Sequence, residues 1–126
     1  LTSEGLTMGM PVVHFEITGH DGALLQSFYS KMFGWRIDAS NPMQYGLVAA
    51  EEKSIGGGIS GYEPGGAPNV TVYIAVDKID PMLAEIGKNG GSTVMPRTVI
   101  PGMVIMALFK DPSGNIIGLV ENEMPA

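Results

Sequence analysis

One pattern of a strand, a helix and further strands occurs twice in this chain of 126 residues. The first copy opens at 12–18 with VVHFEIT, and the second opens at 69–76 with NVTVYIAV. In each opening the side chains alternate between two faces, as they do in a β-strand. Two similar halves in so short a chain predict an α+β fold of two βαβββ modules. We expect the modules to be related by a pseudo-twofold axis, forming a curved, semi-open barrel with a central cavity.

Glycine and proline mark the boundary between the two expected modules. Module one is predicted at 11–61 and module two at 69–121, joined by the linker 62–68, which is too rich in Gly and Pro for the interior of an element. Together they form a single expected domain at 11–124. Residues 1–10 lack the basic start and apolar core of a signal peptide, so we expect a disordered leader or a cloning remnant there.

Each module carries one predicted helix. In module one Asp21 is placed to cap the helix, and Gly34 stands where a glycine commonly ends one. In module two Asp80 is expected to cap, with Pro81 at the first helical position. The helix of module one also carries an apolar stripe expected to pack on its sheet: Leu24, Leu25, Phe28, Tyr29, Met32 and Phe33.

Composition excludes several classes of function. The chain has no cysteine, which rules out disulfides, thiolate catalysis and cysteine-bound zinc. Its formal net charge of −6 disfavours nucleic acid as a partner. No apolar run approaches the ~20 residues that cross a membrane. We therefore expect a cytoplasmic protein with a small-molecule ligand and no membrane partner.

His14 and Glu16 are the one pair of titratable side chains that share the cavity face of a predicted strand. Side chains at i and i+2 lie close enough to share a hydrogen bond or a proton of a ligand. The pair is therefore a candidate acid/base pair or a recognition site for a basic group. A purely structural pair held by hydrogen bonds is the alternative, and the sequence leaves both open.

Other residues are candidates for lining the cavity. The GGGISG stretch at 56–61 matches a nucleotide-binding glycine pattern but does not open a helix, so we reject a dinucleotide site. Bare glycine backbone would instead make room for a ligand or for a close approach of strands. Flexible methionines suit a pocket for flat, apolar ligands, although ordinary core packing also explains them. The candidate ligand-binding residues are Tyr45, Gly58, Thr71, Tyr73, Met103, Met106 and Gly118.

Three motifs give the chain a family resemblance. They are HFEI at 14–17, SFY followed by FGW between 27 and 35, and DPSGN followed by GLVE between 111 and 121. On these motifs the chain resembles the vicinal oxygen chelate superfamily, which includes glyoxalase I, bleomycin-resistance proteins and extradiol dioxygenases. The resemblance covers about 12–121. It implies the two-module fold and a homodimer, and it says little about the reaction.

The same resemblance bears on metal binding. Metal-using relatives take ligands from four cavity positions, which correspond here to His14 and to the neighbourhoods of Gly58, Thr71 and Gly118. Glycine has no side chain, and a threonine hydroxyl is a poor ligand for a divalent ion. Because a catalytic site usually needs three protein ligands, the comparison implies that no metal is bound. We predict no cofactor.

Three functions follow as hypotheses. The first is a metal-independent protein that binds a small apolar or aromatic molecule in the cavity between the modules, by analogy with bleomycin-resistance proteins. The second is an isomerase or lyase that uses His14 and Glu16 as its acid/base pair. The third is a divalent-metal enzyme whose ligands differ from the four positions above.

Overall fold

A computed structural model describes residues 9–122, and the chain divides into two compact units. The N-terminal unit comprises residues 13–72, and the C-terminal unit comprises 73–126 together with 1–12. Most of the expected leader at 1–10 and the last residues of the expected domain at 123–124 lie outside the described residues. In the described part, no helix is long and apolar enough to cross a membrane.

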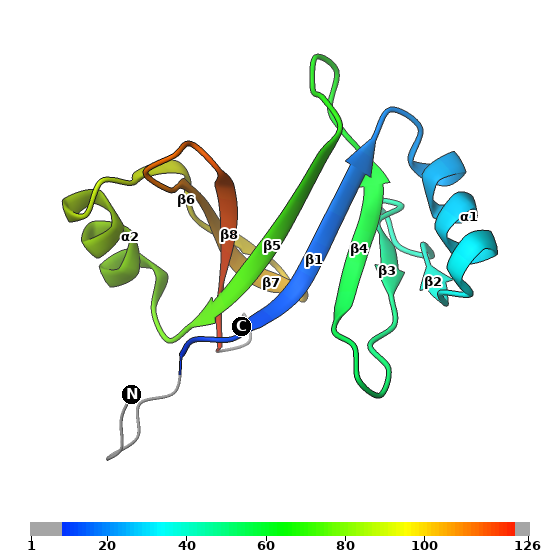
Figure 1. Ribbon diagram of the computed structural model, residues 1–126, viewed down its shortest axis with the longest axis horizontal. Coiled ribbons are helices and arrows are strands. Elements are labelled where there is room, and N and C mark those ends of the chain that lie inside the picture. Colours follow the sequence, from blue (N-terminus) through cyan, green and yellow to red (C-terminus); the bar gives the residue numbers. More distant parts are fainter. Residues whose placement is uncertain (1–8, 123–126) are drawn as a thin grey trace. The chain divides into compact units, whose positions relative to one another are not determined.

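Both halves of the chain have the predicted βαβββ order, and the boundary between the two compact units falls inside the strand that opens the second half (Figure 1). The first runs β1 (Val12–Gly19), α1 (Gly22–Phe33), β2 (Ile37–Asp38), β3 (Gly46–Val48) and β4 (Gly56–Gly61). The second runs β5 (Asn69–Val76), α2 (Ile79–Lys88), β6 (Ser92–Ile100), β7 (Val104–Lys110) and β8 (Ile116–Glu121). The strand orders are β2-β3-β4-β1 and β5-β8-β7-β6. In each unit the opening strand pairs in parallel with the closing strand, so the predicted α+β class is confirmed.

The ends of helix α1 are as predicted. The Asp21 carboxylate accepts a hydrogen bond from the Leu24 N–H at 3.1 Å. Gly34 follows the helix with φ +71°, and its N–H donates to the Ser30 carbonyl at 2.9 Å. A left-handed φ strains any residue with a β-carbon, which explains the glycine.

The expected packing of the apolar stripe of α1 on the sheet is wrong for most of its members. Four of its six members are 51–68% exposed: Leu24, Phe28, Met32 and Phe33. The side of α1 toward the sheet instead carries half-buried Leu25, Gln26 and Tyr29. The Gln26 amide donates to the Ile59 carbonyl of β4 at 2.7 Å. Because successive residues turn about 100° around a helix, this polar anchor rotates the Leu24–Phe28–Met32 row toward solvent.

The cap of helix α2 differs from the prediction. The helix begins at Ile79, so Asp80 and Pro81 both lie inside its first turn. The N-cap residue Lys78 makes no side-chain cap, and the Ile79 N–H donates to Glu121 Oε2 of β8 at 3.0 Å. A carboxylate at this end of a helix satisfies a backbone donor and faces the positive end of the helix dipole. Asp80 therefore does not cap the helix, because the Glu121 carboxylate on strand β8 does so instead.

The Glu121 carboxylate that caps α2 also forms an ion pair with Arg97. Arg97 of β6 donates to it through Nε at 2.8 Å and through Nη2 at 3.2 Å. The Glu121 side chain is only 3% exposed. The hydrogen bond from Arg97, with that from Ile79, lowers the pKa of this carboxyl to about 2. Around it the C-terminal unit buries an apolar core: Val76, Ile79, Ile105, Ala107 and Leu119.

We predict that Glu121→Gln destabilises the protein by about 2 kcal/mol at pH 7, because it removes a charge-assisted, buried pair. The pKa is depressed on folding, so this stability is complete above pH 4.5 and disappears as pH falls toward about 2. Urea unfolding at several pH values measures both effects. Glu85→Gln, which removes an exposed pair with Lys88, should cost less than about 0.5 kcal/mol. Equal stability of Glu121→Gln and wild type at pH 7 would contradict the stabilising role of the Glu121 carboxylate.

Candidate functional site

His14, Tyr45 and Glu16 form one hydrogen-bonded group in the N-terminal unit, which we call the His14 cluster. The Tyr45 hydroxyl lies 2.9 Å from His14 Nε2 and donates to Glu16 Oε2 at 2.9 Å. Since the hydroxyl proton goes to Glu16, His14 donates through its Nε2–H. The His14 and Tyr45 rings are nearly parallel, at 15°. The predicted pair is thus joined by a third residue, and all three side chains are half-buried.

The loop before β3 holds Tyr45 in this place. Asn41 clamps the Tyr45 backbone from both sides, donating to its carbonyl at 2.7 Å and accepting from its N–H at 2.9 Å. Gln44, between them, has φ +52°, a left-handed conformation that this clamp supports. The positioning role of Asn41 was not predicted from the sequence. The only signal was the Asn-Pro turn at 41–42, four residues before the tyrosine.

Two glycines of β4 carry an aromatic ring on each face of the sheet. A β-carbon on Gly58 would lie 1.8 Å from the Tyr45 hydroxyl, and one on Gly57 would lie 2.4 Å from the Phe15 ring. Phe15 pairs with Gly57 and Glu16 with Gly58, so the two rings lie on opposite faces. The glycine stretch therefore makes room for aromatic side chains of the protein, whereas a ligand or a close approach of strands was predicted. The space at Gly58 is filled by Tyr45.

Burial governs the charge state of the His14 cluster. Burial lowers the pKa of the His14 imidazole, and the negative charge of Glu16 partly opposes this shift. The imidazole therefore stays neutral to lower pH than an exposed histidine. A neutral imidazole, a phenol and a carboxylate in series can bind a polar group or move a proton along the chain.

The C-terminal unit has a related arrangement. Tyr73 pairs with Gly118 just as Glu16 pairs with Gly58. A β-carbon on Gly118 would lie 2.2 Å from the Tyr73 ring, so the structure brings these two candidates together. Thr71, two residues earlier in β5 and within the N-terminal unit, is 4% exposed, and its hydroxyl accepts from Asn69 at 2.7 Å.

The two methionine candidates lie in the C-terminal unit. Met106 is half-buried on β7, opposite Val120 of β8. Met103 lies in the turn before β7 and is 40% exposed. Both remain predicted ligand contacts.

The residues at the four family positions do not fit a divalent ion. His14 donates a hydrogen bond through its Nε2–H, while rings cover the backbone of Gly58 and Gly118. The Thr71 hydroxyl is engaged by Asn69. Within residues 9–122, no three His, Asp or Glu side chains gather as a metal site would require. This donor set gives no basis for a metal-dependent step.

Comparisons with known proteins agree with the fold. The pattern of the Glyoxalase/Bleomycin resistance protein/Dioxygenase superfamily matches residues 12–119. "Putative glyoxylase CFP32" of Mycobacterium bovis and of Mycobacterium tuberculosis is 31% identical over an alignment of 107 residues that covers 79% of this chain. The match spans only 41% of the length of those relatives.

Solved structures of low sequence identity share the architecture. Methylmalonyl-CoA epimerase from Mycobacterium tuberculosis superposes with a TM-score of 0.70 at 16% identity, covering 96% of this chain and 93% of that one. A glyoxalase/bleomycin resistance protein/dioxygenase superfamily member from Vibrio splendidus 12B01 gives 0.61 at 16% identity, covering 90% of this chain and all of that chain (100%). These likenesses show the fold.

We predict that Gly58→Ala destabilises the protein by about 2 kcal/mol, because its methyl group overlaps the Tyr45 ring. Gly87→Ala in α2 is the matched control. A β-carbon there meets nothing within 4 Å, so it should stabilise by roughly 0.5–1 kcal/mol. Thermal and urea unfolding measure both. The double variant Gly58→Ala/Tyr45→Ala should show a coupling of about 1 kcal/mol or more, and strict additivity would argue against the contact.

Proposed function

Because the chain belongs to the Glyoxalase/Bleomycin resistance protein/Dioxygenase superfamily, we propose that it binds a small apolar or aromatic molecule without a divalent metal. The His14 cluster supplies the polar contacts. The observation that carries the proposal is the Tyr45 hydroxyl, which links His14 to Glu16 above Gly58. A side chain fills the position from which a metal ligand would come.

The surroundings of the His14 cluster support an apolar ligand. Leu47 of β3 pairs with Gly58, so its side chain shares the face that carries Tyr45 and Glu16. Leu47 is 43% exposed. An exposed leucine beside half-buried polar groups is typical of a site where a few hydrogen bonds orient a mainly apolar ligand. A ligand with an aromatic ring and one polar substituent matches this combination.

Metal independence rests on the same donor set. His14 and Glu16 are two potential ligands, and the third member of the His14 cluster is a phenol that already donates to Glu16. Binding an ion there would break both of these hydrogen bonds of Tyr45. The resulting site would still lack a third strong ligand. We therefore expect ligand binding in the presence of a chelator.

A second candidate function is acid/base catalysis by the His14 cluster. The observation in its favour is the continuous chain from imidazole through phenol to carboxylate, with 2.9 Å at both steps. A neutral His14 can accept a proton from a carbon acid next to a carbonyl, while Tyr45 and Glu16 stabilise the resulting imidazolium. This would be an isomerase-type step on a bound carbonyl compound.

The binding proposal predicts a specific effect of Tyr45→Phe, which keeps the ring over Gly58 and removes the hydroxyl. Chelator-treated protein is screened by thermal shift against small aromatic molecules, and hits are titrated by calorimetry. Loss of one hydrogen bond should weaken a hit by about tenfold. Tyr62→Phe is the control, because Tyr62 also lies beside a histidine, His20, at a ring separation of 6.2 Å. It should leave affinity unchanged.

Metal titration decides the other half of this proposal. Ni²⁺, Zn²⁺, Mn²⁺ and Fe²⁺ are titrated into chelator-treated wild type and His14→Ala. We expect no stoichiometric binding to either protein. Micromolar binding that depends on His14 would overturn metal independence and favour a metalloenzyme.

Deuterium exchange distinguishes a catalyst from a binder. Carbonyl-containing hits are incubated with the protein in D₂O, and loss of the α-proton is followed by NMR. Acid/base catalysis predicts exchange by wild type and a loss of about 10²-fold or more in His14→Ala. Exchange at the rate of the protein-free control, in a hit bound by wild type, would leave binding as the function.

A further inference from the structure

A hollow of about 660 Å³ lies on the other face of the N-terminal sheet from the His14 cluster. Phe15 and Val48 line it, and they face away from Glu16 and Leu47 on the same strands. We call it the aromatic hollow and define it by five of its lining residues: Phe15, Phe33, Trp35, Glu51 and Glu52. It shares no side chain with the proposed site.

Three aromatic rings form the wall of the aromatic hollow. The ring of Trp35 lies 5.4 Å from Phe15 and 5.9 Å from Phe33, measured between centroids. Tyr29 of α1 stacks on Trp35 at 5.2 Å and 13°, which fixes the orientation of the indole. Phe33 is nevertheless 62% exposed at the end of α1. The wall thus consists of rings packed against one another, and part of it is open to solvent.

The rim of the aromatic hollow is acidic. Glu51 and Glu52 lie in the loop between β3 and β4, which closes through the Ser54 N–H and the Glu51 carbonyl at 2.9 Å. Glu51 forms an exposed ion pair with Arg36 at 3.5 Å. Lys53, at the loop tip, has φ +73° and also lines the hollow. The lining side chains thus include two carboxylates and one ammonium group, which leaves the rim with a net negative charge.

We propose that the aromatic hollow is a binding site for an organic cation that carries an aromatic ring and a quaternary ammonium or protonated amine. The face of an indole or phenyl ring attracts a cation through its quadrupole. Glu51 and Glu52 add charge complementarity at the rim, and Phe33 offers exposed surface for the aromatic part of the ligand. The volume of about 660 Å³ lies in the range of small-molecule sites.

The single tryptophan makes this proposal directly testable, because intrinsic indole fluorescence reports on Trp35 alone. Benzyltrimethylammonium is titrated into the full chain, with benzyl alcohol and phenylmethanesulfonate as the neutral and anionic probes. We expect a saturable fluorescence change with the cation. The neutral probe should bind about tenfold more weakly and the anion weaker still.

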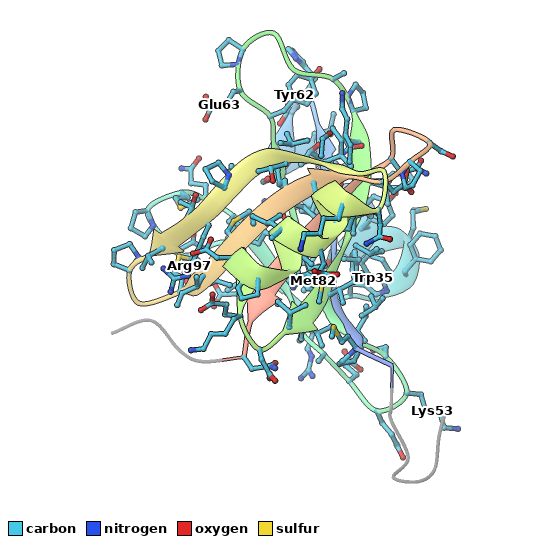
Figure 2. All side chains as sticks on the ribbon, turned by 90° about the vertical axis from the view of Figure 1, so that its left-hand side faces the viewer. Trp35, Lys53, Tyr62, Glu63, Met82 and Arg97 are labelled. Carbon is cyan, nitrogen blue, oxygen red and sulfur yellow. The ribbon has the colours of Figure 1, made fainter. Side chains whose placement is uncertain are left out.

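Matched charge variants test the rim. Glu52→Gln should weaken the cation by about three- to tenfold and leave the neutral probe unchanged. Glu63→Gln removes the same charge from the linker, which Figure 2 shows at the opposite end of this unit from Lys53. It should not change affinity for the cation. Both residues are exposed, so neither variant should impair folding.

Three outcomes would overturn the proposal. They are a linear fluorescence response with no saturation, equal affinity for the cation and the neutral probe, and equal effects of Glu52→Gln and Glu63→Gln. As a check on location, Trp35→Phe is titrated by calorimetry. The variant should bind the cation at least threefold more weakly, because phenylalanine has the weaker quadrupole attraction.

Discussion

The candidate site depends on one contact, the Tyr45 ring lying directly on the backbone of Gly58. Any β-carbon at position 58 would occupy the space of the phenol, so glycine is required there although its backbone is not left-handed. The ring in turn sets the distance between imidazole and carboxylate, since its hydroxyl holds both at 2.9 Å. The glycine, often regarded as empty space for a ligand, here receives a side chain of the protein itself.

The same constraint is met differently in the two units. In the N-terminal unit the ring comes from the loop before β3, which leaves position 16 of β1 for a carboxylate. In the C-terminal unit the ring is Tyr73, which occupies the position equivalent to Glu16 and covers Gly118. Covering the glycine from the opening strand therefore places a phenol where the first repeat has a carboxylate. This explains in physical terms why the first repeat has a carboxylate hydrogen-bonded to the ring that covers its glycine.

Local signals predicted the elements, and long-range hydrogen bonds decided the details. The Asp21 cap and the Gly34 end of α1 each depend on neighbours within five residues, and both are confirmed. The face that α1 turns toward the sheet depends on the hydrogen bond from Gln26 to the Ile59 carbonyl. The cap of α2 depends on Glu121, which is 42 positions from Ile79 in the sequence. Tyr45 lies 31 positions from His14 and 29 positions from Glu16 in the sequence. Alternation along one strand could therefore predict that His14 and Glu16 are neighbours, but not that Tyr45 links them.

The carboxylate of Glu121 shows how position converts the same chemistry into a different role. Arg97 and the Ile79 N–H hold it ionised, so it has little tendency to exchange protons near neutral pH. Glu16 instead accepts from a phenol that itself contacts a neutral imidazole. The surroundings of Glu16 therefore agree with its place in the proposed site, whereas Glu121 stabilises helix α2.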